Sequence, residues 1–366
     1  MPKRLLRVLV VDDSVMYRKV LSDVLSNIPG IEVVGTATDG KVALAKIPQL
    51  KPDMLTLDFD MPELDGLKVL ERVRAEYPDL KTVMVSTHTK EGAAVTLKAL
   101  ELGALTFITK PRTENPLESR TVLFEQLAPV IKEIRDQIHS SYHLAPDLFD
   151  NRDQVISQFS MGDAEPEKIP SPAGSARIQI VAIGISTGGP KALAELIPCL
   201  PETLRIPVVI VQHMPSDFTA ALAESLDQKS AVKVVEAQNN MVLERGTVFI
   251  APGGRQMKVV NISGQSMIEV NDDPPENHCQ PSVDYLFRSV SKVYGKHALG
   301  IIMTGMGSDG VLGLRLMKRL GAQVIAQNRQ SCVVFGMPGE AINAGVVDCV
   351  VPLNQIATQI LQRVGV

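Results

Sequence analysis

The feature that most constrains the fold is an alternation of short apolar runs with helical stretches, which occurs in two blocks. In the first block, the run "LRVLVV" (6–11) precedes a stretch with helical apolar spacing after Ser14, and four more such pairs follow. Short, continuously apolar runs are typical of strands buried on both faces of a parallel sheet. Because strands alternate with helices, we expect a doubly wound, flavodoxin-like parallel sheet of five strands in the order 2-1-3-4-5, with its last helix over 117–137.

The alternation resumes near residue 178 and continues to the end of the chain. Its apolar runs include "IQIVAIG", "IPVVIVQ", "TVFIA", "ALGIIMT" and "AQVIAQ", while a hairpin-like cluster between Val248 and Val270 breaks the βα rhythm. We expect an α/β domain with a mainly parallel sheet and one antiparallel excursion. The segment between the blocks is rich in Pro and Gly and poor in large apolar residues, which is typical of a linker. The predicted organisation is a first domain at 1–138, a linker at 139–176 and a second domain at 177–366.

Composition narrows the class of protein. The net charge is −4 with no basic block, which argues against nucleic-acid binding. No apolar run reaches the roughly 18 residues of a membrane span, and the first apolar run ends in two aspartates, as a strand does and a signal peptide does not. The four cysteines form no CxxC pair, which argues against zinc and favours reduced thiols. We expect a cytoplasmic monomer that is not inserted in a membrane.

Polar residues in the first block follow the ends of predicted strands. Asp12 and Asp13 come after the first strand, Asp58 ends the third, Ser86 ends the fourth and Lys110 follows the fifth. The carboxyl ends of such strands form the ligand-binding edge of the sheet. Three converging carboxylates repel one another unless a hard cation joins them, and oxygen ligands suit Mg²⁺. A hydroxyl and an ammonium group opposite them would bind the oxygens of a transferred phosphoryl group.

The motifs "VLVVDDS", "LTLDFDMPELDG", "VMVST" and "FITKP" resemble those of a response-regulator receiver domain, over about residues 5–125. The resemblance implies that Asp58 is the phosphoacceptor. It also implies that Asp13, Asp58 and the backbone carbonyl of Asp60 hold Mg²⁺, with Asp12 supporting the ion through water.

The same resemblance assigns the residues that respond to the phosphoryl group. Ser86 and Phe107 match the positions whose rearrangement reports phosphorylation, and Lys110 would contact the phosphoryl group itself. A histidine kinase is the implied phosphodonor.

The second block opens on "VAIGISTGGP", which admits two interpretations. It contains G-x-S-x-G, with Ser186 after a strand and Pro190 at the start of a helix, as in a turn that presents a nucleophilic serine. The alternative is a dinucleotide cradle, which needs G-x-G-x-x-G, but Ser186 stands where the middle glycine would be. No acidic residue ends the next strand; Gln212 and His213 stand there instead. The serine turn is the favoured interpretation.

A nucleophilic serine needs a base and an orienting acid. His213 follows the next strand on the same sheet edge, His278 lies in a Pro-rich loop that could reach the site, and His297 precedes its strand and belongs at the opposite edge. His213 is therefore the favoured base, with His278 as the alternative. Asp309, in the loop after "ALGIIMT", also comes at the carboxyl edge, although an aspartate before glycine is common in turns. The chain order Ser–His–Asp differs from that of α/β-hydrolases.

The motifs "GISTGGP", "QHMP", "APGGRQM", "QPSVDYLF", "IIMTGMGSDG" and "VVFGMPGEAINAGVVD" resemble the catalytic domain of the CheB family, the chemotaxis receptor methylesterase/deamidases. The resemblance implies Ser186 as nucleophile, His213 as base and Asp309 as orienter. It places Thr187 and Met306 around the active site, Met306 through its backbone N–H, and it implies no cofactor there. One departure is Gln256, where relatives often carry histidine.

The resemblance implies a phosphorylation-regulated hydrolase that removes methyl groups from glutamate γ-methyl esters, and deamidates glutamines, on methyl-accepting chemoreceptors. The receiver is expected to cover the serine-bearing edge until Asp58 is phosphorylated. Three alternatives stay open: the same hydrolase in a non-chemotaxis receptor-kinase pathway, a receiver-regulated binding module with an inactive esterase domain, and a receiver-linked transcription factor. The last has little support, because neither a helix-turn-helix nor a basic patch follows the linker.

Overall fold

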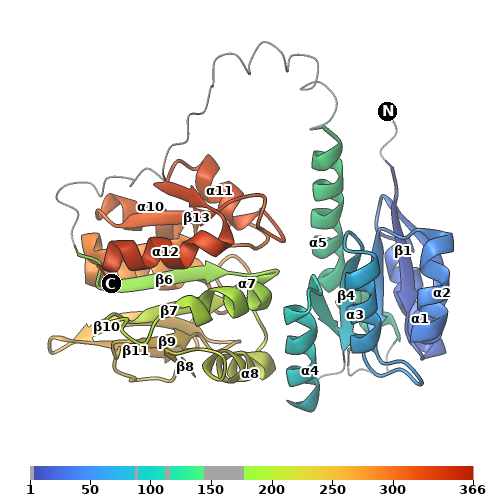
Figure 1. Cartoon of the computed structure of the whole chain (residues 1–366), viewed down its shortest axis with the longest axis horizontal. Coiled ribbons are helices and arrows are strands. Elements are labelled where there is room, and N and C mark those ends of the chain that lie inside the picture. Colours follow the sequence, from blue (N-terminus) through green and yellow to red (C-terminus); the bar gives the residue numbers. More distant parts are fainter. Residues whose placement is uncertain (1–3, 87–89, 112–115, 144–176, 366) are drawn as a thin grey trace, which may run out of the picture.

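The computed structural model describes residues 4–86, 90–111, 116–143 and 177–365, which form two α/β domains lying against each other (Figure 1). The predicted linker is almost entirely outside these residues. The elements of the N-terminal domain are β1 (Leu6–Val11), α1 (Val15–Ser26), β2 (Ile31–Ala37), α2 (Gly40–Leu50), β3 (Met54–Asp58), α3 (Gly66–Glu76), β4 (Lys81–Ser86), α4 (Lys90–Glu101), β5 (Thr106–Thr109) and α5 (Pro116–His143). Helix α5 thus continues beyond residue 137, where the sequence pattern predicts its end.

The N-terminal sheet has the order β2-β1-β3-β4-β5 with every pair parallel, which confirms the doubly wound prediction. Three helices begin at side chains that accept a backbone N–H of the first turn. Ser14 accepts from Tyr17, Asp39 from Val42 and Asp65 from Lys68. These caps satisfy donors that a helix start leaves free and fix where each strand hands over to its helix.

The C-terminal domain repeats the pattern with more elements. They are β6 (Ile180–Ile185), α7 (Gly189–Leu196), η2 (Ile197–Cys199), β7 (Val208–Gln212), α8 (Ser216–Asp227), β8 (Lys233–Glu236), β9 (Thr247–Ile250), β10 (Gln256–Ile262), β11 (Gln265–Asn271), α9 (Val283–Tyr294), η3 (Gly295–His297), β12 (Ala298–Ile302), α10 (Val311–Arg319), β13 (Gln323–Gln327), α11 (Met337–Asn343), β14 (Cys349–Val351) and α12 (Leu353–Val364).

The main C-terminal sheet is parallel throughout, in the order β14-β13-β12-β6-β7-β9-β8. The antiparallel excursion is the separate hairpin β10–β11, which confirms its existence but places its start at Gln256, since β9 joins the parallel sheet. Its turn has positive φ at Ser263 (51°) and Gly264 (86°), the conformation that suits a tight hairpin.

Helices cover both faces of this sheet. Buried side chains of α7, α8 and α12 belong to one apolar cluster, while those of α9, α10, α11 and the hairpin belong to another. Neighbouring residues of one strand divide between the two: Val181 faces the first and Ala182 the second. Burial on both faces explains why these strands read as continuous apolar runs.

The domains meet where α4 of the first packs against α7 and α8 of the second (Figure 1). The first apolar cluster is continuous across this boundary, with Leu97 and Leu100 on one side and Phe218 and Leu222 on the other. Within the described parts of the chain, no helix has both the length and the apolar character needed to span a bilayer.

Candidate functional site

Ser186 lies in a tight turn directly after β6. Its N–H donates to the Thr304 carbonyl at 2.9 Å, and its own carbonyl accepts from the Gly189 N–H at 2.8 Å. The φ of Gly188 is 78°, a conformation that glycine adopts readily and that lets α7 begin at once. The buried Gln212 side chain donates to the Ser186 carbonyl at 3.0 Å, and a Cβ on Gly189 would lie 1.8 Å from its Oε1.

Gln212 was not expected to act in this way, because the sequence shows only that it ends a strand. Its amide also donates to the His213 carbonyl at 3.0 Å, so one side chain connects the serine turn to the histidine. Strand register brings the same two segments together, since Ile185 pairs with Gln212 and the His213 N–H donates to the Ile185 carbonyl. Ser186 and His213 therefore follow neighbouring strands at the same level.

Of the three predicted residues, His213 and Asp309 are joined by a hydrogen bond. Nε2 of His213 lies 2.8 Å from Oδ2 of Asp309, which is 3 % exposed, and the histidine is half-buried. The loop between β12 and α10 carries Asp309, so all three predicted residues lie at the carboxyl edge of the sheet. The exposed His278 makes no hydrogen bond to either member of this pair. His297, in η3, lies beside the start of β6, where its Nδ1 lies 3.0 Å from the Arg177 carbonyl oxygen.

The start of α9 holds the Asp309 carboxylate. The N–H groups of Val283 and Asp284 donate to it at 2.7 and 3.1 Å, the Ser282 hydroxyl at 2.9 Å and the Asn277 amide at 3.0 Å. A helix N-terminus carries free N–H donors and favours an anion. The sequence signal for this cradle is "PSVD", in which Ser282 caps the helix by accepting from the Tyr285 N–H.

These contacts set the protonation of the pair. Burial by itself would lower the pKa of His213, but the hydrogen bond to Asp309 and the nearby Cys279 thiol raise it to about 9. Burial by itself would raise the pKa of Asp309, but the bonds from His213, Val283 and Asn277 lower it to about 2. The pair is therefore an imidazolium and a carboxylate at neutral pH.

The second ring nitrogen of His213 does not contact the serine in this structure. Nδ1 lies 3.8 Å from Sγ of Cys279, and no hydrogen bond joins it to the Ser186 hydroxyl. Cys279 belongs to the Pro-rich loop after β11, which reaches the site through Cys279 and Asn277. Sequence reasoning singled out His278 in this loop and missed both of its neighbours.

Two backbone donors face no partner near the serine. Among the described residues, neither the Thr187 N–H nor the Met306 N–H donates a hydrogen bond. The loop that carries Met306 is held close by Gly305, whose N–H donates to the Val334 carbonyl at 3.0 Å, and a Cβ on Gly305 would lie 2.7 Å from Cβ of Ser186. Free N–H groups beside a serine can stabilise a developing oxyanion.

The acidic pocket of the N-terminal domain brings together Asp12, Asp58 and Lys110. Nζ of Lys110 lies 2.6 Å from Oδ2 of Asp58 and 2.9 Å from Oδ2 of Asp12, and all three side chains are buried. The ring of Tyr17, which the sequence did not single out, lies 4.7 Å below the ammonium group.

Burial is the largest influence on the pKa values in this pocket. Burial raises the pKa of Asp58 to about 6, since the opposing charge of Lys110 is partly offset by Asp12. Burial raises the pKa of Asp12 as well. For Lys110, burial would lower the pKa, but the two carboxylates raise it.

Oxygen atoms of Asp12, Asp13 and Asp58 lie within 4.8 Å of one another, as a site for a hard divalent cation requires. Oδ2 of Asp12 is buried and accepts no hydrogen bond of normal geometry from another described group, although Lys110 lies near it. Asp13 is exposed, so the site is open to solvent on one side. The side chain of Asp60 is exposed and outside this cluster. These residues fit Mg²⁺.

The two predicted switch positions lie on the neighbouring strands β4 and β5. Ser86 ends β4, and its side chain lies outside the described residues. Phe107 is in β5, and its ring lies 4.4 Å from the ring of Phe218, a fully buried residue of α8. Sequence reasoning gave no indication of this contact between the domains.

Known proteins resemble the chain over its whole length. Residues 181–360 match the family model described as CheB methylesterase, and residues 8–121 match the response regulator receiver domain. Curated relatives are the protein-glutamate methylesterase/protein-glutamine glutaminases of Desulfotalea psychrophila (44% identical, 98% of each chain) and Bacillus subtilis (42% identical, 97% of this chain and 98% of the relative). The solved CheB methylesterase catalytic domain of Thermotoga maritima is 37% identical, with a TM-score of 0.50, and covers 51% of this chain and 99% of its own.

Proposed function

The chain belongs to the CheB methylesterase family, with a receiver domain before the catalytic domain, and we propose that it removes methyl groups from glutamate γ-methyl esters, and deamidates glutamines, on chemoreceptors. This activity gives sensory adaptation, and a histidine kinase would regulate it through the receiver. The cytoplasmic helices of the receptors are the substrate that the family implies. The observation that carries the proposal is that Ser186, His213 and Asp309 lie at one edge of the sheet, with His213 hydrogen-bonded to Asp309.

In the first step, the Ser186 hydroxyl oxygen attacks the γ-carbonyl carbon of the ester. The neutral form of His213, a minor fraction at pH 7, accepts the serine proton at Nδ1, because Nε2 is hydrogen-bonded to Asp309. For this step, the serine takes the place of the Cys279 thiol beside Nδ1. The Thr187 and Met306 N–H groups stabilise the oxyanion, and each such donor contributes about 2.7–4 kcal/mol in serine hydrolases.

In the second step, the carbon–oxygen bond to the methoxy group breaks, and the imidazolium of His213 gives its proton to that oxygen, which leaves as methanol. Water then attacks the acyl-enzyme while His213 accepts its proton, and the glutamate carboxylate is released with the serine restored. The same sequence on a glutamine expels ammonia instead of methanol. Asp309 keeps the histidine oriented and stabilises its charged form throughout.

In the receiver, the Asp58 carboxylate attacks the phosphoryl group of the kinase histidine, and the phosphorus–nitrogen bond breaks to leave an acyl phosphate on Asp58. Mg²⁺, held by Asp13, Asp58 and the Asp60 carbonyl with Asp12 behind them, would neutralise charge on the phosphoryl oxygens. Lys110, now paired with Asp58 at 2.6 Å, is placed to bind one of those oxygens.

The domain contact supports regulation by occlusion. Gly188, two residues after Ser186, shares one cavity with Ala104 and Leu105 of the receiver, so the receiver lies against the edge that bears the nucleophile. Phe107 in β5, the strand that leads to Lys110, contacts Phe218 of the catalytic domain. Moving a population from 1% to 99% open takes about 5.5 kcal/mol, more than one phosphoryl group with a few new bonds is expected to supply. Activation is therefore graded.

Methanol release from methylated receptor, with and without acetyl phosphate, tests both domains at once. Wild type should release methanol faster with the phosphodonor. Ser186→Ala should release none above background in either condition, while Ser216→Ala, an exposed serine at the start of α8, should behave as wild type. Release by Ser186→Ala at the wild-type rate would contradict the proposal.

A further inference from the structure

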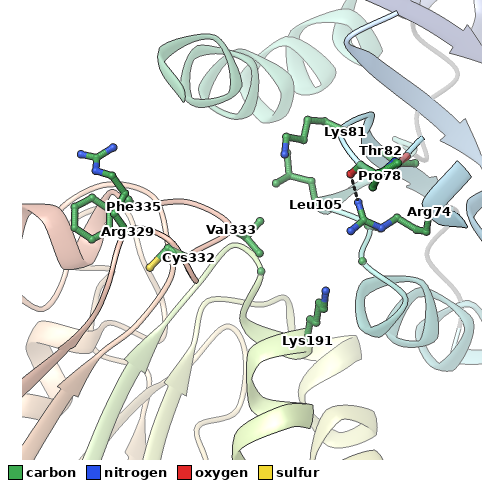
Figure 2. A pocket seen from close by; sticks show the side chains of 13 residues that line it. Arg74, Pro78, Lys81, Thr82, Leu105, Lys191, Arg329, Cys332, Val333 and Phe335 are labelled. Carbon is green, nitrogen blue, oxygen red and sulfur yellow. Dashed lines mark hydrogen bonds between the residues drawn. The ribbon is translucent and has the colours of Figure 1, made fainter. Parts of the chain in front are cut away.

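A cavity of about 360 Å³ lies between the two domains and is lined by both (Figure 2). The receiver contributes Arg74 near the end of α3 and Lys81 at the start of β4. The catalytic domain contributes Lys191 in the first turn of α7 and Arg329 in the loop after β13. In Figure 2, the head groups of Arg74, Lys81 and Lys191 point toward the space between the domains. No aspartate or glutamate is among the described residues that line the cavity.

These cations lack carboxylate partners among the described residues. Lys81 and Lys191 make no ion pair there, and the Arg74 guanidinium donates to the neutral Pro78 carbonyl at 3.0 Å. Arg329 differs from the others, because its guanidinium lies over the Phe335 ring, 4.4 Å from its centre. Four cations therefore line one cavity in a molecule whose net charge is −4.

The surroundings of Lys81 disfavour its charged form. Burial lowers the pKa of Lys81, the charge of Arg74 lowers it further, and Asp79 opposes this only in part. The Thr82 hydroxyl, in the same wall, is buried and has no hydrogen-bond partner among the described residues. An anion in the cavity would relieve the repulsion and leave each ammonium or guanidinium group with a charge-assisted bond.

We propose that this cavity binds an oligophosphate anion that bridges the two domains. Cations on facing walls need a ligand with charge at more than one point, and a phosphate chain carries such charges close together. Guanidinium forks and ammonium groups are both common phosphate ligands in proteins. The volume suits a phosphate chain, free or attached to a nucleoside, and is at the small end for organic ligands.

Bridging has a regulatory consequence that rests on the proposed function. A ligand that needs both walls binds only when the domains are together, so it favours the arrangement in which the receiver lies against the Ser186 edge. By linkage, phosphorylation of Asp58 and oligophosphate binding oppose each other. Oligophosphate binding itself requires neither ester hydrolysis nor phosphorylation of Asp58, so it can be measured separately from both.

Isothermal titration calorimetry of the full chain with inorganic pyrophosphate, and separately with ATP free of divalent cations, tests the proposal at low salt. We expect one ligand per chain, with affinity that falls as salt rises. Lys191→Gln and Lys81→Gln, on opposite walls, should each weaken binding about tenfold. Arg329→Gln should weaken it less, because that guanidinium lies over Phe335. Lys292→Gln, an exposed lysine of α9 on the other face of the sheet, is the matched control and should bind as wild type.

Each result decides the matter. Equal affinities for the two ligands assign recognition to the phosphate chain, and tighter binding of ATP assigns it to a nucleoside-borne chain. No binding of either, or equal losses in Lys191→Gln and Lys292→Gln, overturns the site. Loss in only one of the two wall variants overturns the bridging. In parallel, pyrophosphate should slow methanol release by wild type more than by Lys191→Gln, and an absence of methanol release in every sample would count against the proposed function without touching the calorimetry.

Discussion

Each of the two domains has a buried acid–base pair, but the pKa of the acid is shifted in opposite directions. Each places a buried acid–base pair at the carboxyl edge of a parallel sheet, Asp58 with Lys110 in the receiver and Asp309 with His213 in the catalytic domain. In the receiver, the pKa of the acid is raised to about 6 by burial. In the catalytic domain, the pKa of the acid is lowered to about 2 by its donors.

The neighbours explain the difference. Asp309 has four donors besides His213, two of them N–H groups at the start of α9, so its charge is satisfied in the resting protein. Asp58 has the N–H of Phe59 and the ammonium of Lys110, and it shares the latter with Asp12. A satisfied carboxylate holds its partner fixed through a reaction cycle, whereas a crowded carboxylate gains stability when a cation or a phosphoryl group arrives. Structure thus assigns a fixed role to one acid and a changeable role to the other.

The largest expected effect on activity comes from removing the negative charge of Asp309. Asp309→Asn leaves His213 without its counter-charge and allows the wrong tautomer, and in serine hydrolases this change costs about 10⁴-fold in kcat. Methanol release under saturating receptor measures it. Asp284→Asn is the matched control, because Asp284 is buried next to Asp309 and shares the Asn277 amide but does not contact the histidine. A loss of similar size in both variants would show that the cradle's integrity, and not the charge on Asp309, is what matters.

The next effect concerns pH. A His213 pKa of about 9 means that the neutral base is scarce at pH 7, so kcat/KM should rise roughly fifty-fold between pH 7 and pH 9. The raised pKa stabilises the fold below the unfolded value of about 6.5, and this contribution is lost as pH rises through 9. Activity and stability therefore change in opposite directions over one window. Rates of Ser186→Ala supply the alkaline background, and a plateau already present at pH 7 would show that His213 is neutral there.

Replacing Asp58 of the receiver with asparagine should stabilise the fold, because the charge of Asp58, unlike that of Asp309, is poorly satisfied. Because the pKa of Asp58 is raised from 3.8 to about 6, its ionisation opposes folding: the fold is favoured fully below pH 3.8, and this contribution declines as pH rises through 6. Asp58→Asn should raise the unfolding free energy at pH 7 by up to about 3 kcal/mol, since Asp12 still pairs with Lys110. Urea unfolding in chelator, followed by circular dichroism, measures it. Asp13→Asn, exposed, should change little, and a destabilised Asp58→Asn would remove the contrast with Asp309.

The sequence predicts the strand-end residues of each site better than the loop residues. Strand-end residues such as Asp58, Ser186 and His213 could be placed because buried strands read as apolar runs and parallel strands share a carboxyl edge. Strand β14 was missed, because a strand of three residues is too short to show a periodic pattern. Loop residues were missed for a different reason. Asn277 has a φ of 52°, and such a conformation is fixed by tertiary contacts that no local pattern records.

The residues through which the two domains contact each other could not be predicted from the sequence. Glu101 and Phe107 read as ordinary helix and strand residues of the receiver. Their partners lie in α8, more than a hundred residues away in the chain, and the contacts exist only because the domains pack. Apolar periodicity shows which face of a helix or strand is buried. It does not show which other element packs against that face.

The smallest expected effect tests an ion pair that joins the two domains, between Glu101 and Lys229. Oε1 of Glu101, at the end of α4, accepts from Lys229 Nζ at 2.7 Å and from the Ser225 hydroxyl at 2.9 Å, and its side chain is 20% exposed. A pair this open contributes about 0.2–1 kcal/mol, so Glu101→Gln should raise basal methanol release about 1.5- to 5-fold and leave the rate with phosphodonor unchanged. Glu244→Gln, exposed before β9, is the control. Because salt screens an exposed pair, the gain should shrink as salt rises. If basal release does not change, the apolar contact of Phe107 with Phe218 holds the domains together, and regulation then depends on packing between the domains and not on charge.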